Sequence, residues 1–153
     1  MRRKQKEILD QNTIEHLIQS ATVLRLGLTD GLTPYVVPLN YGYKDNTFYI
    51  HCALEGRKLD LIAKNPTVCF EIEGKQELVT GDVACDWTLK FESVIGYGIA
   101  HIIEAKEEKL EGLAVLMNQF SNRKDFDFSE RVVERIKIIK IDITQKTGKS
   151  SFQ

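Results

Sequence analysis

Residues 35–43 read YVVPLNYGY, and this stretch indicates the fold more clearly than any other. Its large side chains alternate with mostly small or polar ones, which is typical of a β-strand that buries one face. The proline favours an edge strand or an irregular one, because proline cannot donate a backbone hydrogen bond. One predicted face contains Tyr35, Val37, Leu39, Tyr41 and Tyr43, and the other contains Val36, Pro38, Asn40 and Gly42.

The segments on either side of this strand also have β-strand character. Residues 22–29 are β-prone and are followed by the turn signal Asp30-Gly31. Residues 47–52 form a similar run after the turn signal Asp45-Asn46. We therefore predict an antiparallel meander of three strands.

The rest of the chain contains further strands and a few short helices. Strands are predicted at 67–72, 89–103 and 136–143, with a connection or short strand at 73–80 and a polar loop at 122–129. Helices are predicted to end near residue 20 and to span 56–64 and 106–119. The predicted buried helix faces contain Leu59, Ile62 and Ala63 in the second helix, and Leu110, Leu113, Ala114 and Met117 in the third.

Three local patterns predict finer details. Asn12 and Glu15 have the spacing of a capping box at a helix start. The apolar positions of the last strand change face at residues 138–139, which suggests a β-bulge. Gly96 and Gly98 share one strand face, where either close packing against a helix or a ligand would explain the missing side chains.

Six strands joined mostly by short turns predict a mainly β protein, a closed or half-closed antiparallel barrel with helices at its edges. A doubly wound parallel fold is not expected, because it would need helices that alternate regularly with strands and the predicted helices do not. The chain has 153 residues and no linker, repeat or low-complexity segment. We therefore expect residues 1–153 to form one domain.

Composition and charge exclude several classes of partner. Hydrophobic and charged fractions of 42% and 28% are those of an ordinary globular protein. A net charge of -1 gives no general attraction to nucleic acid or anionic lipid, so we expect neither partner. The basic cluster at the start of the chain is interpreted as a solvated turn rather than a nucleic-acid arm; it comprises Arg2, Arg3, Lys4 and Lys6.

The chain is expected to be cytoplasmic. No apolar run reaches the roughly 18 residues of a membrane helix, and no signal-peptide core follows the charged start. Cys52, Cys69 and Cys85 are widely spaced and odd in number, which favours reduced thiols over disulfides or a zinc site.

Two cations lie where a predicted helix begins. Arg57 and Lys58 fall in the first turn of helix 56–64, where the helix dipole is already positive and carboxylates are favoured. A bound anion would explain them, because backbone N–H groups, a guanidinium and an ammonium together suit a phosphate. Gly56 would allow the ligand to approach closely. The alternative is a solvated basic pair beside Glu55.

The strand face with small side chains at 35–43 is a second candidate site. A flat aromatic ligand could lie against it and hydrogen-bond to the main chain of residues 37–41. The alternative is an edge strand that faces solvent.

Other reactive residues give weaker signals. His51 and Cys52 are adjacent in a strand and point to opposite faces, so they do not form a metal site, and no metal is predicted. Ser93 lacks the glycine pattern of a nucleophile elbow. Trp87 is interpreted as a core or interface anchor.

Taken together, these segments resemble the pyridoxamine 5′-phosphate oxidase-like FMN-binding split barrels, most closely the branch with nitroimidazole-resistance proteins. The resemblance covers nearly the whole chain and depends on the order and spacing of several segments. They are residues 1–4 (MRRK), 34–41 (PYVVPLNY), 49–58 (YIHCALEGRK), 65–71 (NPTVCFE), 85–98 (CDWTLKFESVIGYG) and 147–149 (TGK).

The resemblance implies a six-stranded, Greek-key-like barrel and a homodimer with two FMN molecules at the subunit interface. It also implies that Arg57 and Lys58 hold the FMN phosphate, with Gly56 replacing the serine of some relatives. The cofactor ring would be lined by the main chain of Val37, Pro38, Leu39 and Asn40, with His51 near the ribityl chain or ring and Ser93 and Val94 contacting the cofactor from the long strand.

The implied function is that of a flavin oxidoreductase. FMN would pass electrons from a reduced nicotinamide or another donor to a small planar acceptor such as a nitroaromatic. His51 would donate a proton, form a stacking wall, or only contact the cofactor. The substrate-phosphate residues of the true oxidases are not found.

The alternative is a flavin or haem carrier without turnover. A haem would need an axial ligand such as His51 or His101. Arg57 and Lys58 favour a phosphate-bearing ligand over haem.

Overall fold

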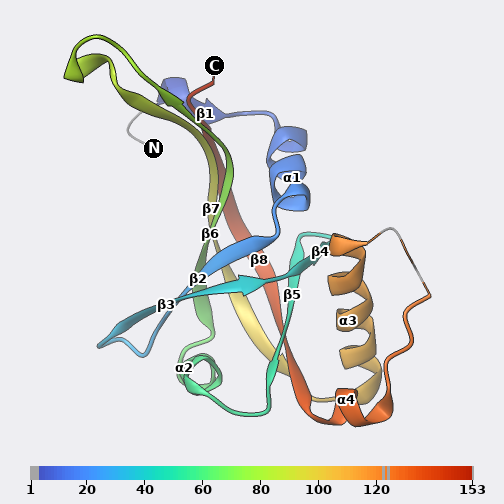
Figure 1. Cartoon of the computed structure of the whole chain (residues 1–153). Helices are drawn as coiled ribbons and strands as arrows, with labels where there is room; N and C mark the ends of the chain where they lie inside the picture. Colours follow the sequence, from blue (N-terminus) through green and yellow to red (C-terminus); the bar gives the residue numbers. More distant parts are fainter. Residues whose placement is uncertain (1–3, 122, 124, 153) are drawn as a thin grey trace.

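The computed structural model describes residues 4–121, 123 and 125–152, which form an antiparallel β-structure with short helices at its edges (Figure 1). The predicted mainly β fold with flanking helices is therefore confirmed. The hydrogen-bonded strand order is β3-β2-β6-β7-β8-β5-β4, with β1 paired to β8. The strands are β1 (Glu7–Ile8), β2 (Val23–Thr29), β3 (Pro34–Asn40), β4 (Gly42–Lys44), β5 (Thr47–Ala53), β6 (Thr67–Val79), β7 (Thr88–Ile103) and β8 (Ile136–Ser150). Arg2 and Arg3 of the basic cluster, and residues 122 and 124 of the predicted loop, lie outside the described residues.

The predicted strand 35–43 divides into β3 and β4, which together with the short β1 raises the six predicted strands to eight. The division occurs because the chain leaves its partner β2 and continues beside β5. Tyr41 marks the crossing; it is fully buried, and its hydroxyl donates to the carbonyl of Ile18. Gly42 follows, and a Cβ there would lie 2.4 Å from the Cα of Leu116, so glycine allows β4 to lie against α3. The predicted alternation of faces is confirmed along β3.

Aromatic rings fill the interior of the barrel. The rings of Phe48 and Phe70 meet edge to face, with centroids 4.9 Å apart. Gly96 makes room for this packing, because a Cβ there would lie 2.4 Å from Cζ of Phe70. A Cβ at Gly98 would likewise lie 2.7 Å from Cγ2 of Ile141. These two glycines therefore serve strand packing in the core, and neither predicted explanation, a helix or a ligand, applies to them.

Asp10 caps the first helix, α1 (Gln11–Ser20), so the predicted capping box of Asn12 and Glu15 is wrong. The Asp10 carboxylate accepts hydrogen bonds from backbone N–H groups of the first turn. Glu15 instead accepts hydrogen bonds from the ammonium of Lys146 on β8 and the hydroxyl of Tyr43 on β4. Its side chain therefore ties α1 to the barrel.

The contacts among Glu15, Tyr43 and Lys146 shift the pKa values of Glu15 and Tyr43. Burial opposes ionisation of Glu15, but the hydrogen bonds from Lys146 and Tyr43 outweigh it and hold the pKa of Glu15 below its usual value. Burial and the neighbouring Glu15 raise the pKa of Tyr43. Lys146 also donates to Oδ1 of Asn46 at 2.6 Å.

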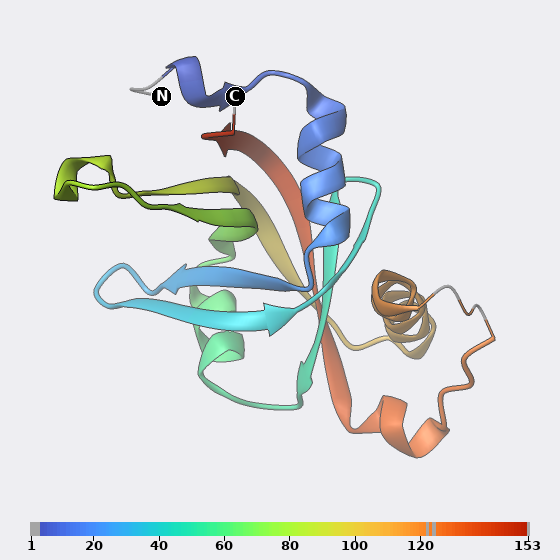
Figure 2. The same ribbon diagram turned by 45° about the horizontal axis from the view of Figure 1, so that its top comes forward.

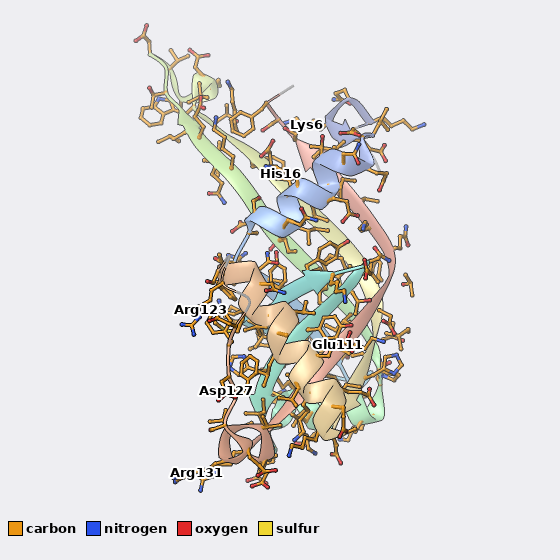
Figure 3. The ribbon with its side chains drawn as sticks, turned by 90° about the vertical axis from the view of Figure 1, so that its right-hand side faces the viewer. Lys6, His16, Glu111, Arg123, Asp127 and Arg131 are labelled. Atoms are coloured by element: carbon orange, nitrogen blue, oxygen red, sulfur yellow. The ribbon has the colours of Figure 1, made fainter. Side chains whose placement is uncertain are left out.

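Three further helices cover the barrel: α2 (Arg57–Lys64), α3 (Lys106–Phe120) and α4 (Glu130–Glu134). Figure 3 views the molecule from the side that α3 covers, where it lies against β4 and β5. The predicted helix faces are partly wrong, because Ala63 and Ala114 are exposed, and Leu110 and Met117 are only half-buried. The buried residues are Leu59, Leu61 and Ile62 in α2, and Lys109, Gly112, Leu113, Val115 and Leu116 in α3.

The predicted bulge at residues 138–139 is also wrong. Pairing of β8 with β5 and β7 is continuous there. The apolar pattern changes because β8 is buried on both faces: Ile138 packs with Leu113 and Val133 beneath the helices, and Ile139 lies inside the barrel. The bulge occurs instead at Thr144, where the pairing with β7 shifts by one residue. β8 then continues to Ser150, beyond the predicted end at residue 143.

The hairpin of β6 and β7 extends past the barrel as an arm (Figures 1 and 2). The predicted connection at 73–80 belongs to this arm, since β6 continues to Val79 with one irregularity between Glu73 and Gln76. Trp87 lies near the arm's tip with 52% of its surface exposed, so it is not a core residue. Among the described residues, no helix is both long and apolar enough to cross a membrane.

Candidate functional site

The barrel is open between β3 and β5. Within the described part of the chain, β3 is paired with β2 alone. β5 is paired with β4 only from Thr47 to Tyr49, so β8 is the single partner of its second half among the described residues. Two strand edges with unpaired backbone groups are thus available at one place. We call this place the open edge.

The helix α2 begins close to the open edge and presents the two predicted cations. Gly56 precedes it with φ of 138°, a left-handed backbone that favours glycine. The guanidinium of Arg57 lies 4.8 Å from the centre of the Tyr35 ring, at the start of β3. No ion pair among the described residues involves Arg57 or Lys58. The structure therefore places Arg57 beside the first residues of β3, against Tyr35 on the core side of that strand.

Lys58 follows Arg57 in the first turn of α2. It is half-buried, and its charge reaches the buried thiol of Cys52 at the end of β5. Burial raises the pKa of that thiol, and the positive charges of Lys58 and Lys137 offset part of the rise. Cys52 is therefore a neutral packing residue near neutral pH.

Pro38 indicates which backbone groups of β3 face the open edge. Proline fits a strand where its missing N–H would point away from the partner. In an antiparallel ladder the backbone groups alternate in direction, so those of Val36 and Asn40 and the Pro38 carbonyl face the open edge. The backbone groups of Val37 and Leu39 then point to β2, and their side chains pack against the core. Val36 belongs to the predicted ligand face, and its backbone is a candidate contact that the predicted main-chain range 37–41 did not include.

His51 lies on the half of β5 that β4 does not cover. Its imidazole is exposed and points to the outer side of the sheet, the side of its cross-strand partner Ile138. His101, the other candidate haem ligand, is elsewhere on β7, with Nε2 3.3 Å from Oδ2 of Asp142.

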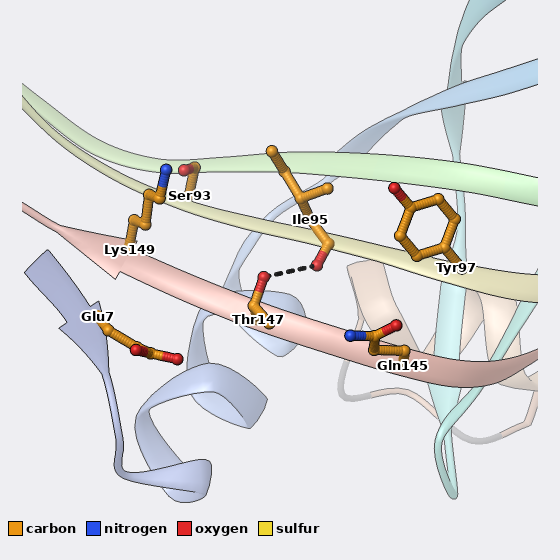
Figure 4. A pocket seen from close by; sticks show the side chains of 7 residues that line it. All are labelled: Glu7, Ser93, Ile95, Tyr97, Gln145, Thr147 and Lys149. Carbon is orange, nitrogen blue, oxygen red and sulfur yellow. Dashed lines mark hydrogen bonds between the residues drawn. The ribbon is translucent and has the colours of Figure 1, made fainter. Parts of the chain in front are cut away.

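The structure does not bring Ser93 and Val94 to the open edge of the same chain. Val94 is fully buried inside the barrel, so only its backbone can contact a ligand. Ser93 faces outward into a groove of about 310 Å³ on β7 and β8 (Figure 4). β3 and β7 are three strands apart in the sheet, which corresponds to about 14 Å along its surface.

The site residues therefore form two groups on one chain. Arg57, Lys58, His51 and the edge of β3 surround the open edge, whereas Ser93 lies on the outer face of β7. The first group offers cations without an ion-pair partner among the described residues, beside strand edges unpaired within the same part of the chain. This combination suits a ligand with a phosphate and a flat polar ring.

The comparison with protein families matches residues 10–150 to the pyridoxamine 5′-phosphate oxidase family. A proposed 5-nitroimidazole antibiotic resistance protein from Bacteroides thetaiotaomicron is 33% identical, with a TM-score of 0.83 over 94% of this chain and 85% of that chain. No curated protein matches the sequence.

Two more distant structures share the fold. A flavocytochrome from Azotobacter vinelandii is 18% identical, with a TM-score of 0.84 over 98% of this chain and 71% of that chain. An FAD- and haem-binding protein from Mycobacterium smegmatis is 14% identical, with a TM-score of 0.86 over 97% of this chain and 74% of that chain.

Proposed function

Because the chain belongs to the pyridoxamine 5′-phosphate oxidase family, we propose that it is an FMN-binding oxidoreductase whose flavin occupies the open edge. One observation carries this proposal: two cations without ion-pair partners among the described residues begin α2 beside the unpaired edge of β3. Arg57 and Lys58 would bind the phosphate. The backbone of Val36, Pro38 and Asn40 would hydrogen-bond to the ring.

The residues of this chain bind and orient, while a bound flavin supplies the electron transfer. We propose that a reduced nicotinamide is the electron donor and that a small planar nitroaromatic is the acceptor. The 33% identity to a proposed 5-nitroimidazole resistance protein supports that acceptor class. His51, exposed beside the open edge, is the candidate proton donor.

We also propose that the protein is a cytoplasmic homodimer with FMN at the subunit interface. The separation of Ser93 from Arg57 within one chain supports a shared site, because a flavin that contacts both needs Ser93 from a second copy. Three free cysteines, Cys52, Cys69 and Cys85, are compatible with a reducing compartment.

Absorbance spectroscopy of the purified protein, before and after addition of FMN, tests the cofactor. We expect flavin bands that are released on denaturation. A Soret band would favour the haem alternative instead. Titration with FAD in parallel separates the two flavins, and we expect tighter binding of FMN. NADH oxidation with a 5-nitroimidazole tests turnover, and a flavin-loaded protein without turnover would be a carrier.

The double variant Arg57→Ala with Lys58→Ala tests the phosphate site. We expect FMN affinity to fall at least tenfold, because each charge-assisted hydrogen bond contributes roughly 1.5–3 kcal/mol. Lys64→Ala is the matched control, since Lys64 is an exposed cation at the other end of α2. Unchanged FMN affinity in the double variant would exclude these residues as phosphate ligands.

A further inference from the structure

An aromatic ring contacts the guanidinium of Arg57 at the start of α2. Its central carbon lies 4.8 Å from the centre of the Tyr35 ring. No ion pair within the described part of the chain involves Arg57. The position of this guanidinium is therefore set by an aromatic ring rather than by a carboxylate.

Two other arginines of the chain are held differently. The guanidinium of Arg25 pairs with two glutamates of β6, at 3.0 and 2.9 Å. Arg123 lies 5.1 Å from the centre of the Phe126 ring, but its Nε also donates to Oδ1 of Asp125 at 2.7 Å. Both arginines therefore use N–H donors within the protein, and these donors would have to be released before either side chain bound a ligand.

Stacking on a ring leaves the hydrogen-bond donors of a guanidinium available. Its N–H donors lie in the plane of the group, whereas a stacked ring contacts the face of that plane. A stacked arginine can therefore hold a phosphate with two parallel hydrogen bonds at the same time. The ring also attracts the cation without neutralising its charge. The contact with Tyr35 thus holds Arg57 in place and keeps it able to bind an anion.

Tyr35 is itself fixed by the fold. It lies on β3 opposite the buried Leu28 of β2, and it packs against the hydrophobic core. The helix α2 lies against β2, the strand next to β3 (Figure 2). Arg57, in contrast, is exposed at the start of α2. A half-buried ring therefore holds an exposed side chain that would otherwise be free to rotate.

Two carboxylates close to Arg57 in the chain could compete for its guanidinium. Glu55 precedes it by two residues, and Asp60 follows it by three, a spacing at which helix side chains form ion pairs. Within the described residues, neither carboxylate pairs with Arg57. Such a pair would occupy donors that a phosphate requires. The Tyr35 ring therefore favours the orientation in which Arg57 remains available.

We propose that Tyr35 is a positioning residue for the cofactor phosphate, because its ring orients the Arg57 guanidinium before the ligand binds. This inference rests on the proposed function, in which Arg57 and Lys58 bind the FMN phosphate. Orientation in advance reduces the side-chain freedom that is lost on binding. It acts only on ligands with a phosphate. Tyr35 therefore contributes to a preference for FMN over riboflavin, which has the same ring system and no phosphate.

The affinities for FMN and for riboflavin, measured by isothermal titration calorimetry, test this role. Tyr35→Leu removes the ring and keeps an apolar side chain against the core. We expect it to weaken FMN binding about two- to fivefold, which corresponds to a cation–π contact of about 0.5–1 kcal/mol. Riboflavin binding should stay unchanged. A purely structural role of Tyr35 would weaken the binding of both flavins equally, and that result would overturn the inference.

Tyr35→Phe and Tyr49→Leu are the controls. Tyr35→Phe retains the ring and should bind FMN as tightly as the wild type. Tyr49 is another half-buried tyrosine, on β5, and it packs with Leu113 of α3. Tyr49→Leu removes a ring of the same size and should leave both affinities unchanged. Equal losses of FMN affinity in Tyr35→Phe and Tyr35→Leu would assign the effect to the hydroxyl and overturn the role of the ring.

A double variant tests whether the Tyr35 ring acts through Arg57. If it does, Tyr35→Leu should cause no further loss of FMN affinity in a protein that already carries Arg57→Ala. The same loss with and without Arg57 would overturn the inference.

The outcomes also separate this inference from the proposed function. If the wild type binds FMN and Tyr35→Leu binds it equally tightly, the role of Tyr35 is overturned and the flavin site remains. A wild type that binds neither FMN nor riboflavin would overturn the proposed function, and the role of Tyr35 with it.

Discussion

The strands β8 and β3 differ in how completely the rest of the chain surrounds them. β8 lies inside the sheet, paired with β7 and β5, and Ile138 and Ile139 are buried on its opposite faces. Among the residues that the structure describes, β3 lies at the end of the sheet with one partner, and Val36 on its outer face is 64% exposed. Burial on both faces stabilises a fold, whereas an unpaired edge leaves backbone groups available for a ligand.

Alanine substitutions in β8 and β3 should show the largest difference in the free energy of unfolding. Ile139→Ala should lower the free energy of unfolding by about 2–5 kcal/mol, because it leaves a cavity in the closed core. Val36→Ala should change it by no more than about 0.5 kcal/mol, because the side chain is at the surface. Urea denaturation measures both. Equal losses of unfolding free energy in the two variants would contradict the difference in burial between β8 and β3.

Acid denaturation should test how much the contact between Lys146 on β8 and ionised Glu15 stabilises the fold. The pKa of Glu15 is lower in the folded state, so the ionised form stabilises the fold at neutral pH. This contribution is present above the unfolded pKa, about 4.5, and is lost as pH falls through the folded value. Glu15→Gln should therefore melt a few degrees below the wild type at pH 7.

The control is the pH dependence of the difference in melting temperature between the wild type and Glu15→Gln. The gap in melting temperature between wild type and Glu15→Gln should narrow as the pH is lowered below about 4.5. A gap that stays constant down to pH 3 would show that Glu15 acts only through packing.

Pro38→Ala on β3 should have the smallest effect on stability. The new N–H would face the open edge, so no ladder hydrogen bond changes, and the greater freedom of the unfolded chain should cost no more than about 1 kcal/mol. Denaturation with urea measures this cost. A markedly more stable variant would mean that Pro38 interrupts the pairing with β2.

Much of the fold could be predicted because local patterns identify strands and turns. The alternation at 35–43 placed Tyr35 and Val37 on the buried side, as the structure has it. The pattern at 138–139 led to the wrong prediction of a bulge, because two consecutive buried residues indicate either a bulge or a strand covered on both faces. Only the position of α3 over β8 distinguishes these cases.

The candidate site was predicted as separate segments. Arg57 and Lys58 stood out because cations are unfavourable at a helix start, and Pro38 stood out because it interrupts a ladder. Their proximity to each other could not be inferred from either segment. It depends on the contact of Arg57 with Tyr35, which brings residues 22 positions apart in the chain to 4.8 Å.

The sequence alone indicated most of the strands and the longer helices of this protein, because hydrophobic periodicity and turn residues act over a few positions. It also determined the two cations at the start of α2 and the resemblance to a flavin-binding family. Only the tertiary structure decided that β3 has an open edge, that Ser93 lies three strands away, and that the arm leaves Trp87 exposed. These features depend on which strands pair across long separations, and pairing is set by the packing of the whole core.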